Sequence, residues 1–284
     1  MTTIWLNSNE ITDHQQTKIP LKNIKRGVAY GDGFFDTICV TNGVIEFKDD
    51  HISRIENGLK LGDYHPFADW KSILTQAAEK AGTLSIDKAR LRIQFFREGN
   101  YGYHTDADCE THVLVELSES SGKINRNYEL ITASVPRIPR AAMPGNVKWS
   151  NGMNYILARQ EAQKTGANDA LMLTMDGFIS ETTISNIFWR IGNDVYMPSD
   201  ECDQLSGIMM SNIAQFVEES SKLNLRRGKF KPEVFAQAES VWVSNSMMRM
   251  QPIRSLDDHQ FTWTKTDELL RRTLLSYIED QHRA

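Results

Sequence analysis

Cysteine is scarce in this chain. The three cysteines, Cys39, Cys109 and Cys202, are odd in number and lie far apart in the sequence. Such spacing indicates neither a disulfide framework nor a cysteine-based metal site, so we expect a reducing compartment and no metal ion.

Long apolar runs are also missing. No stretch is apolar over enough residues to cross a bilayer, and Met1 to Asn7 lacks the basic and apolar regions of a signal peptide. The formal net charge is −5 and no long basic run occurs, which argues against a nucleic-acid partner. The sequence therefore predicts a cytoplasmic protein that has neither a membrane nor a nucleic acid as its partner.

What the chain does have is the composition of a globular protein. Of its 284 residues, 40% are hydrophobic and 24% are charged, which is enough apolar material for a sizeable core. Residues 118–127 are small, polar and unpatterned, as in a linker. We expect a small N-terminal domain over 1–119, a linker over 120–127, and a large domain over 128–284 that carries Lys148 and most of the functional site.

The first half of the chain shows strand and helix signals in turn. Alternating apolar residues predict strands over 3–6, 34–40, 44–47, 89–96 and 111–117. The Asn42-Gly43 pair is typical of a hairpin turn. A helix is expected over 51–59, and Asp69 should cap a second helix that ends at Gly82. The face that the second helix should bury consists of Trp70, Ile73, Leu74, Ala77 and Ala81.

The second half continues the mixture. Its expected strands are 128–135, 169–175, 178–181, 186–191, 195–197 and 241–243. Its expected helices run over 152–165, closed by Gly166, over 207–217, and onward from a cap at Thr266. The side chains expected to face inward are Met153, Ile156, Leu157 and Ala162 in the first of these helices and Leu270, Leu274, Tyr277 and Ile278 in the last.

Lys148 has an unusual setting for a lysine. Most lysines are solvated surface charges, but this one lies between a Pro/Gly-rich approach, 136–145, and the helix that begins near 152. A lysine that forms a Schiff base with pyridoxal phosphate needs a partner acid for the pyridine nitrogen and a separate phosphate cradle. Glu181 is a candidate acid, and the Gly207 region is a candidate cradle. The sequence therefore predicts a pyridoxal-phosphate enzyme.

Several patterns allow two interpretations. The glycines of 27–33 suggest backbone that lies close to another segment, and a plain turn explains them equally well. Arg54, which shares a helix face with His51, suits a phosphate, although a surface ion-pair helix is the commoner case. Gly207 opens a helix whose N–H groups suit an anion, or it only marks a helix start. The polar-aromatic loop 97–105 either lines a site or is an ordinary hairpin loop.

Taken together, these motifs resemble the class IV pyridoxal-phosphate enzymes, the family of branched-chain aminotransferases, D-amino-acid aminotransferases and aminodeoxychorismate lyases. The resemblance runs from Arg26 to about Pro252, and the order of the pieces makes it specific. The pieces are Arg26-Gly27, Gly31-Asp32-Gly33-Phe34-Phe35, His51-Ile52-Ser53-Arg54, Lys148-Trp149-Ser150-Asn151, Leu157 to Ala162, Glu181 to Phe188, Leu205 to Met209, and Ser244-Asn245-Ser246.

The family implies a fold and an assembly. It implies a two-domain α+β or α/β fold of the class IV aminotransferase type, in which a small N-terminal α/β domain is joined to a larger domain with a β-barrel-like core. It also implies a homodimer in which the two domains close over the cofactor and loops of the partner complete the pocket.

The family implies a role for each matching residue. Lys148 forms the Schiff base with pyridoxal 5′-phosphate and later shuttles the proton, and Glu181 faces the pyridine nitrogen. The remaining positions hold the cofactor's phosphate. They are Arg54, the backbone N–H groups of Ile208 and Met209, and the hydroxyl of Ser246.

Two positions depart from the family pattern. Met210 stands where a basic residue is usual, and Met197 stands where a threonine is common. Neither is a catalytic position in the family, so the expected consequence is a difference in local packing.

Within the family the sequence favours an aminodeoxychorismate lyase, which acts on a small amino substrate and forms p-aminobenzoate and pyruvate in the folate pathway. The segments 186–198, 244–252 and 99–105 resemble the lyases. A class IV aminotransferase for branched-chain or D-amino acids is the alternative. Asp36 stands where those enzymes tend to have an acid, and Tyr101 replaces an arginine that is common in the lyase loop.

The substrate pocket should decide between these activities. Phe35, Tyr101, Tyr103 and His104 are its expected walls, and His104 falls roughly where D-amino-acid aminotransferases hold a substrate carboxylate. A homologue without catalysis is a third class, against which the intact Lys148, Glu181 and Arg54 argue.

Overall fold

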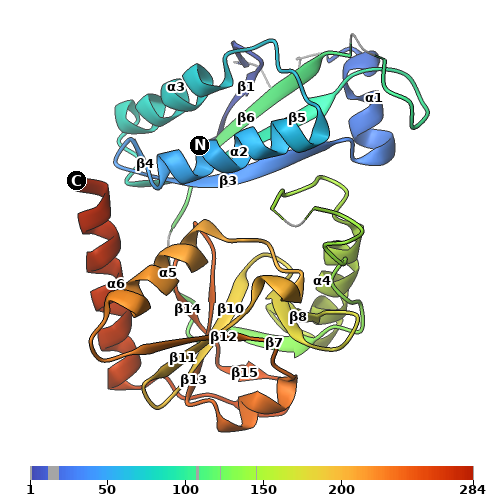
Figure 1. Cartoon of the computed structure of the whole chain (residues 1–284). Coiled ribbons are helices and arrows are strands. Elements are labelled where there is room, and N and C mark those ends of the chain that lie inside the picture. The colour runs from blue at the N-terminus through green and yellow to red at the C-terminus, as the bar shows by residue number, and fades with distance from the viewer. Residues whose placement is uncertain (1, 12–18, 107–108, 122, 145, 284) are drawn as a thin grey trace. The chain divides into compact units, whose positions relative to one another are not determined.

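The computed structural model describes residues 2–11, 19–106, 109–121, 123–144 and 146–283, with side chains up to residue 280. The chain divides into two compact units, Met1–Gly122 with Asn146–Gly152, and Lys123–Gly145 with Met153–Ala284 (Figure 1). Each unit contains one β-sheet and its own helices. The predicted α+β fold class is confirmed.

The division places the lysine segment in the first unit. The sequence predicts Lys148 in the large domain beyond the linker, whereas Asn146–Gly152 packs with the first unit. Strand-like pairing explains this grouping, because the segment bonds to the backbone of residues 33–35. Residue 122 of the predicted linker lies outside the described residues. The predicted domain boundaries stay a prediction.

The first unit is built on a six-stranded antiparallel sheet in the order β2-β1-β6-β5-β3-β4. Helices α2 and α3 pack on one face of it and share its apolar core (Figure 1). The strands are β1 (Thr2–Leu6), β2 (Asn9–Ile11), β3 (Gly33–Thr41), β4 (Val44–Ile45), β5 (Lys88–Arg97) and β6 (Thr111–Glu119), and the helices are α1 (Leu21–Tyr30), α2 (Lys48–Gly62) and α3 (Trp70–Thr83).

Successive side chains of β3 point to opposite faces of the sheet. Phe34 and Ile38 are buried, while Phe35 and Thr37 are half-buried on the other face, as the period of two in a strand requires. Side chains of β5 on that second face include Arg92, which lies opposite Thr37 in the register. The face away from α2 and α3 therefore carries Phe35 and Arg92, whereas Asp36 lies on the same side as α2 and its Arg54.

Local sequence signals in the first unit are largely confirmed. Asn42 and Gly43 have φ of 50° and 79° and turn β3 into β4. The carboxylate of Asp69 accepts the N–H of Ser72 at 3.1 Å at the start of α3, and the predicted apolar face of that helix is buried. Gly82 does not end α3, which continues to Thr83.

Two expectations in this half are wrong. The strand predicted over 44–47 stops at Ile45, because Phe47 has φ of 49° and caps α2. The plain turn offered as an alternative for residues 27–33 is wrong for its first part, because this segment belongs to α1, which ends where Gly31 adopts the left-handed φ of 62°. The single glycine inside α1, Gly27, is tolerated at a cost of about 1 kcal/mol relative to alanine.

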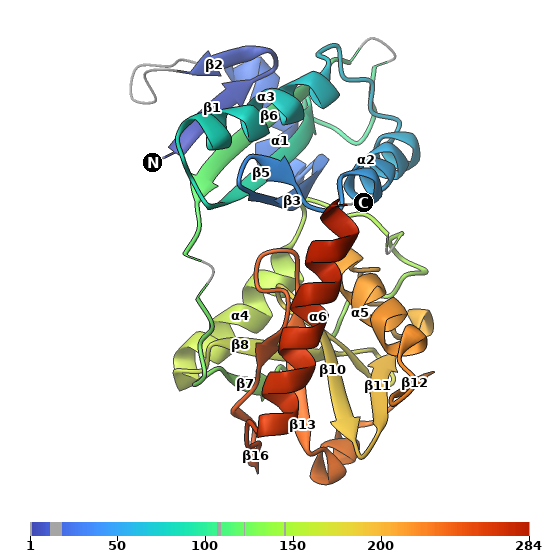
Figure 2. The ribbon, with the colours of Figure 1, turned by 90° about the vertical axis from the view of Figure 1, so that its left-hand side faces the viewer.

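The second unit contains a ten-stranded mixed sheet in the order β12-β11-β10-β9-β8-β7-β15-β16, with β13 and β14 joined at β10. In Figure 2, α5 and α6 lie side by side, and α4 packs against β8. Its elements are β7 (Glu129–Thr132), α4 (Met153–Thr165), β8 (Asp169–Leu173), β9 (Ile179–Thr182), β10 (Asn186–Ile191), β11 (Asp194–Pro198), η1 (Asp200–Cys202), α5 (Ile208–Glu219), β12 (Asn224–Gly228), η2 (Pro232–Gln237), β13 (Ser240–Ser244), β14 (Gln251–Pro252), β15 (Ser255–Leu256), β16 (His259–Gln260) and α6 (Lys265–Arg283).

The predicted inner face of α4 is confirmed at Ala162 and wrong at the other three positions. Met153, Ile156 and Leu157 are 62%, 51% and 44% exposed, and only Ala158 and Ala162 are buried. Small alanine side chains let the helix lie close to β8, so the alanine face points inward and the larger apolar side chains remain outside.

The last helix begins earlier than expected. Thr264 is its cap, because its hydroxyl accepts the N–H of Asp267 at 3.2 Å, whereas Thr266 lies inside α6. Leu274 and Ile278 are buried, as predicted. Leu270 and Tyr277, also expected inside, are half-buried.

No helix among the described residues is long and apolar enough to cross a membrane.

Candidate active site

Lys148 is held by backbone pairing to β3. The N–H of Phe35 donates to the carbonyl of Lys148 at 2.9 Å, and the N–H of Ser150 donates to the carbonyl of Gly33 at 2.9 Å. Phe34 and Trp149 form an isolated antiparallel bridge between these bonds. The lysine therefore has a rigid backbone, as a catalytic nucleophile requires.

Glycine makes this pairing sterically feasible. A Cβ on Gly31 would lie 2.9 Å from the backbone N and Cα of Asn151, and a Cβ on Gly33 would lie 2.2 Å from the carbonyl oxygen of Phe95. The prediction that the glycines of 27–33 lie close to another segment is confirmed at these two positions.

The amine of Lys148 lies over an aromatic ring that also carries an arginine. Its Nζ is 5.6 Å from the centroid of Phe35, and Cζ of Arg92 is 3.7 Å from the same centroid. The structure therefore brings two of the predicted site residues together, and it adds Arg92, which sequence analysis missed. The alternation of 89–96 was the only signal, since it placed Arg92 opposite the buried Leu91 and Ile93.

Arg54 belongs to a buried charged cluster. Its Nε donates to Oδ2 of Asp36 at 3.2 Å and its Nη2 donates to Oδ1, while His51 Nδ1 lies 2.9 Å from Oδ2. Asp36 and His51 are each 1% exposed. Arg54 is thus fixed by contacts of Nε and Nη2, and Nη1 takes no part in its pair with Asp36.

The charges of this cluster lower the pKa of the Asp36 carboxyl. Burial by itself would raise the pKa of the Asp36 carboxyl, but the charges and hydrogen bonds of Arg54 and His51 outweigh it and hold the pKa well below its usual range. Asp36 is therefore an anion at neutral pH. The prediction that Arg54 binds a phosphate stays a prediction. Its alternative, an ion pair on an exposed helix surface, is excluded because Asp36 and His51 are buried.

In the second unit, Glu181 is enclosed by donors. Its Oε1 accepts from Arg137 Nε at 2.6 Å and from the Tyr155 hydroxyl at 2.9 Å, and its Oε2 accepts the N–H of Leu205 at 3.0 Å. Glu181 is 4% exposed. Burial, and then the negative charge of Glu181, raise the pKa of Tyr155 far above its ordinary value, so its hydroxyl stays a donor.

Arg137 and Tyr155 were not predicted as partners of Glu181. Arg137 lies in the segment after β7 and Tyr155 lies in α4, so both are distant from Glu181 in the sequence. Nothing in their local patterns singles them out, and only tertiary contact reveals them.

At the start of α5, no side chain among the described residues caps the backbone N–H groups. Gly207 precedes the helix without a side-chain cap, and no acidic residue occupies the first turn. A Cβ on Gly207 would lie 1.9 Å from Oδ1 of Asn186, whose Nδ2 donates to the carbonyl of Leu205 at 2.8 Å. Asn186 and Glu181 are register partners, so the helix start, with Ile208 and Met209, is fixed beside the strands that carry the acid.

Ser246 lies in the turn after β13, and its side chain is half-buried. The two residues that depart from the family pattern, Met210 and Met197, are both buried, at 6% and 1% exposure. Met210 faces the helix start, where its Cβ lies 3.6 Å from the position a Cβ of Gly207 would occupy.

The other predicted pocket walls are exposed within their own unit. Tyr101 and Tyr103 are 68% and 93% exposed, and His104 is exposed and lies 3.7 Å from Asp106. These three residues project from a loop and do not close a pocket among themselves. Their role toward a substrate stays a prediction.

Comparison with known proteins gives a consistent result. The amino-transferase class IV family matches residues 33–256 of the chain. The aminodeoxychorismate lyase of Vibrio harveyi is 27% identical over 248 residues, which cover 85% of this chain and 88% of the relative. The D-alanine aminotransferase of Bacillus licheniformis is 24% identical over 239 residues, which cover 82% and 81%.

A solved structure shares the fold. The X-ray crystal structure of an aminotransferase from Brucella abortus, bound to the co-factor PLP, matches with a TM-score of 0.86 at 19% identity and covers 98% of this chain and 99% of that chain. The chain therefore shares the fold of that aminotransferase. Because the family matches most of the sequence, the chain belongs to the amino-transferase class IV family. The predicted family, enzyme class and cofactor are confirmed at this level.

The residues present fit this cofactor. The uncapped helix start at Gly207 supplies N–H groups for a phosphate. Glu181 is a buried carboxylate with three donors on it, and since a carboxylate has about four acceptor positions, one remains for a protonated ring nitrogen. Lys148, half-buried on a fixed backbone, supplies the amine.

Proposed function

We propose that this protein is a pyridoxal-phosphate-dependent 4-amino-4-deoxychorismate lyase that forms p-aminobenzoate and pyruvate. The observation that carries the proposal is the turn at Asn245. Its Oδ1 accepts the N–H groups of Met247 and Met248 at 2.9 and 2.8 Å, and its Nδ2 donates to the carbonyl of Ile184 at 3.1 Å. The sequence resembles the lyases at this asparagine, where branched-chain aminotransferases carry Gly-Thr. The Vibrio harveyi lyase adds support.

The residues of the site have two roles in this proposal, which are cofactor binding and proton transfer. Lys148 binds the cofactor and, once released, takes the proton from the amine-bearing carbon of the substrate. The bound cofactor supplies an electron sink for the carbanion that this proton transfer leaves. The ring C–O bond then breaks, the enolpyruvyl group leaves as enolpyruvate and takes up a proton to become pyruvate, and the ring that remains is aromatic, as p-aminobenzoate.

Two sets of residues would bind the cofactor, one at its ring nitrogen and one at its phosphate. Glu181, oriented by Arg137 and Tyr155, would hold the ring nitrogen and favour its protonated form. Four groups would bind the phosphate through charge-assisted and helix-start hydrogen bonds. They are the guanidinium of Arg54, the N–H groups of Ile208 and Met209, and the hydroxyl of Ser246.

Arg92 is the residue we assign to the substrate. It is half-buried, and its Cζ lies 3.7 Å from the ring centroid of Phe35. Among the described residues its side chain forms no hydrogen bond or salt bridge, so the five N–H donors of its guanidinium are available. Burial, and then the charge of Arg90, lower the pKa of its guanidinium below the ordinary value. A substrate carboxylate beside Lys148 and Phe35 would give the guanidinium of Arg92 a charged hydrogen-bond partner. Aminodeoxychorismate has two carboxylates.

Replacing Arg92 by glutamine should therefore weaken substrate binding. Loss of one charge-assisted pair is expected to raise KM by roughly tenfold or more, with kcat changed far less. The control is Arg90→Gln, because Arg90 already donates to Glu116 at 2.9 Å. Steady-state kinetics on both variants decide the assignment, and equal KM values for Arg92→Gln and the unchanged enzyme would remove it.

A class IV aminotransferase remains the second candidate. Asp36 is the specific observation in its favour, because aminotransferases of the family tend to have an acid at that position. The D-alanine aminotransferase of Bacillus licheniformis is a relative over a similar length. Lys148 and Glu181 would serve both reactions, since the two share every step up to the carbanion.

The deciding experiment mixes the purified holoenzyme with aminodeoxychorismate and follows p-aminobenzoate and pyruvate together. Equal amounts of the two products are expected. If neither appears, and the cofactor absorption band shifts on addition of an L- or D-amino acid, the protein is an aminotransferase and the responsive isomer gives its stereochemistry.

A cytoplasmic location and a homodimer are further parts of the proposal. The apolar side chains on the outer face of α4, Met153, Ile156 and Leu157, support a subunit interface, because they are large and exposed in the single chain. The net charge of −5 and the scarcity of cysteine support the location.

A further inference from the structure

The loop from Glu98 to His104, which we call the aromatic loop, is fastened to the rest of the first unit through its backbone. The carbonyl oxygens of Asn100, Gly102 and His104 all accept hydrogen bonds from Nη1 of Arg26, at 3.1, 2.9 and 3.0 Å. The alternate residues Tyr101 and Tyr103 project outward and are exposed. One arginine thus fixes the inner side of the loop that presents both tyrosines.

Arg26 is itself immobilised. It is 4% exposed, and its Nε donates to Oδ2 of Asp32 at 2.7 Å. Asp32 also accepts the hydroxyl of Tyr64 at 2.9 Å and lies 3.5 Å from Nη1 of Arg97. The guanidinium therefore has one end in a fixed ionic cluster and the other end in the loop.

Helix α1 supplies further contacts to the aromatic loop. The N–H of Gly102 donates to the hydroxyl of Tyr30 at 2.7 Å, and the N–H of Gly99 donates to the carbonyl of Lys22 at 3.3 Å. Gly99 has φ of 126°, and a Cβ there would lie 3.1 Å from Cδ of Arg26. The loop can approach Arg26 this closely only because position 99 is glycine.

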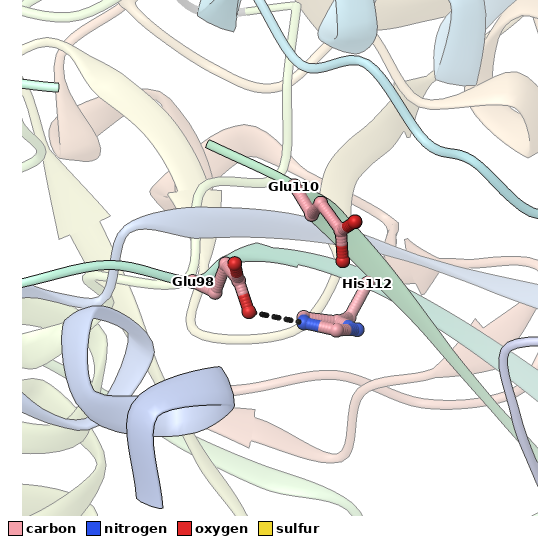
Figure 3. Close-up of side chains that lie close together, drawn as sticks. All are labelled: Glu98, Glu110 and His112. Atoms are coloured by element: carbon pink, nitrogen blue, oxygen red, sulfur yellow. Dashed lines mark hydrogen bonds and ion pairs between the residues drawn. The ribbon is translucent and has the colours of Figure 1, made fainter. Parts of the chain in front are cut away.

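The base of the loop is held by a second contact, shown in Figure 3. Glu98, Glu110 and His112 have ligand-type atoms within 4.8 Å of one another, the arrangement of a possible metal site. Oδ1 of Asn7 accepts the N–H of Val113, so Nδ2 of Asn7 faces Nδ1 of His112 and donates to it. The hydrogen of His112 therefore sits on Nε2, which donates to Glu98 at 3.3 Å.

This tautomer decides against a metal ion at the cluster. A metal would need the lone pair of Nε2 and would leave a hydrogen on Nδ1, directed at the amide hydrogens of Asn7. The cluster instead ties the first residue of the aromatic loop to β6.

We propose that Arg26 is a positioning residue for substrate binding, which acts by holding the aromatic loop in the conformation that presents Tyr101, Tyr103 and His104. The inference rests on the proposed function, which assigns these three side chains to the substrate. Arg26 touches neither substrate nor cofactor in this role. Arginine is needed because a planar guanidinium reaches Asp32 and the three carbonyls at once, whereas a lysine ammonium has a single nitrogen.

The test uses Arg26→Lys and Arg26→Met, with Arg97→Lys as the matched control. Arg97 is also buried and also lies beside Asp32, but its Nη2 donates to the carbonyls of Gly62 and Asp63, outside the loop. A merely structural role predicts similar behaviour for the two arginines. The positioning role predicts effects on the loop and on substrate binding for Arg26 alone.

Four readouts are compared on the holoenzymes. Both Arg26 variants should raise KM by about tenfold or more, because the hydrogen bonds from Arg26 to the carbonyls of the loop are lost. The value of kcat should change far less, and the cofactor absorption band should be retained. Amide hydrogen exchange at residues 99–104 should accelerate in the Arg26 variants and stay unchanged in Arg97→Lys.

Each result has a separate meaning. If the unchanged enzyme turns over but the Arg26 variants keep its KM, the positioning role is wrong. Unchanged exchange at 99–104 would also overturn it, whether or not a substrate is known. If the unchanged enzyme acts on neither aminodeoxychorismate nor amino acids, the proposed function fails, and the exchange data alone still decide whether Arg26 holds the loop.

Discussion

Replacement of Lys148 by alanine is expected to remove turnover almost completely. The amine is the group that binds the cofactor and then moves the substrate proton, so one substitution removes both roles. Removal of a positioned acid–base group alone costs up to about 10⁴-fold, and loss of the nucleophile adds to this. Turnover of aminodeoxychorismate, measured with the absorption spectrum of the bound cofactor, checks the prediction.

The matched control for this variant is Lys164→Ala. Lys164 is an exposed lysine in the last turn of α4, and its loss should change neither spectrum nor rate. The assignment of Lys148 fails if Lys148→Ala keeps both its absorption band and its turnover. Purified unchanged protein without any cofactor band would revive the third class, a homologue without catalysis.

Among the substitutions proposed for this protein, Asp36→Asn is expected to lower the free energy of unfolding the most. Asp36 is a buried anion between His51 and Arg54, and removal of its charge leaves the arginine inside without a counter-charge. Breaking such a buried pair costs about 3–5 kcal/mol. Urea unfolding of the two proteins at neutral pH measures the difference.

An exposed pair of the same residue types provides the control. Asp63 Oδ1 lies 3.0 Å from Nε2 of His65, with side chains that are 90% and 76% exposed. Asp63→Asn should give no measurable change, because water screens an exposed pair. Equal stability changes in Asp36→Asn and Asp63→Asn would contradict the role assigned to burial.

The effect of Asp36 should also depend on pH. Its pKa in the folded protein lies well below the value of about 3.9 in an unfolded chain. A lowered pKa contributes stability that is fully present above the unfolded value and is lost as pH falls toward the folded one. The difference between the unchanged protein and Asp36→Asn should therefore be constant from about pH 5 upward and shrink below about pH 4. A difference that stayed constant down to pH 2 would contradict the lowered pKa.

Local signals in the sequence predicted local structure well. The Asn42-Gly43 turn and the Asp69 cap depend on side chains within four residues of one another, and both are present. Expectations failed where neighbours in space decide. The outer position of Ile156 in α4 follows from the packing of alanines on β8, which no periodicity of the helix itself reveals.

The functional site shows the same division. Lys148, Glu181 and the Gly207 helix start could be selected from the sequence, because each belongs to an ordered set of motifs with a chemical reason. Their partners could not be selected. Arg137 and Tyr155 on Glu181, and Arg92 on Phe35, are joined to them only by contacts across the fold.

By itself, the sequence determined the family, the mixture of helices and strands, and the residue types that pyridoxal-phosphate chemistry needs. Only the tertiary structure decided that Lys148 pairs with β3, that Asp36 is an anion held by Arg54, and that Arg26 fastens the aromatic loop. The physical reason is that motifs and periodicity report interactions between residues close in the chain. Burial, charge pairing and hydrogen-bond partners arise between residues that are distant in the chain and meet only in the folded protein.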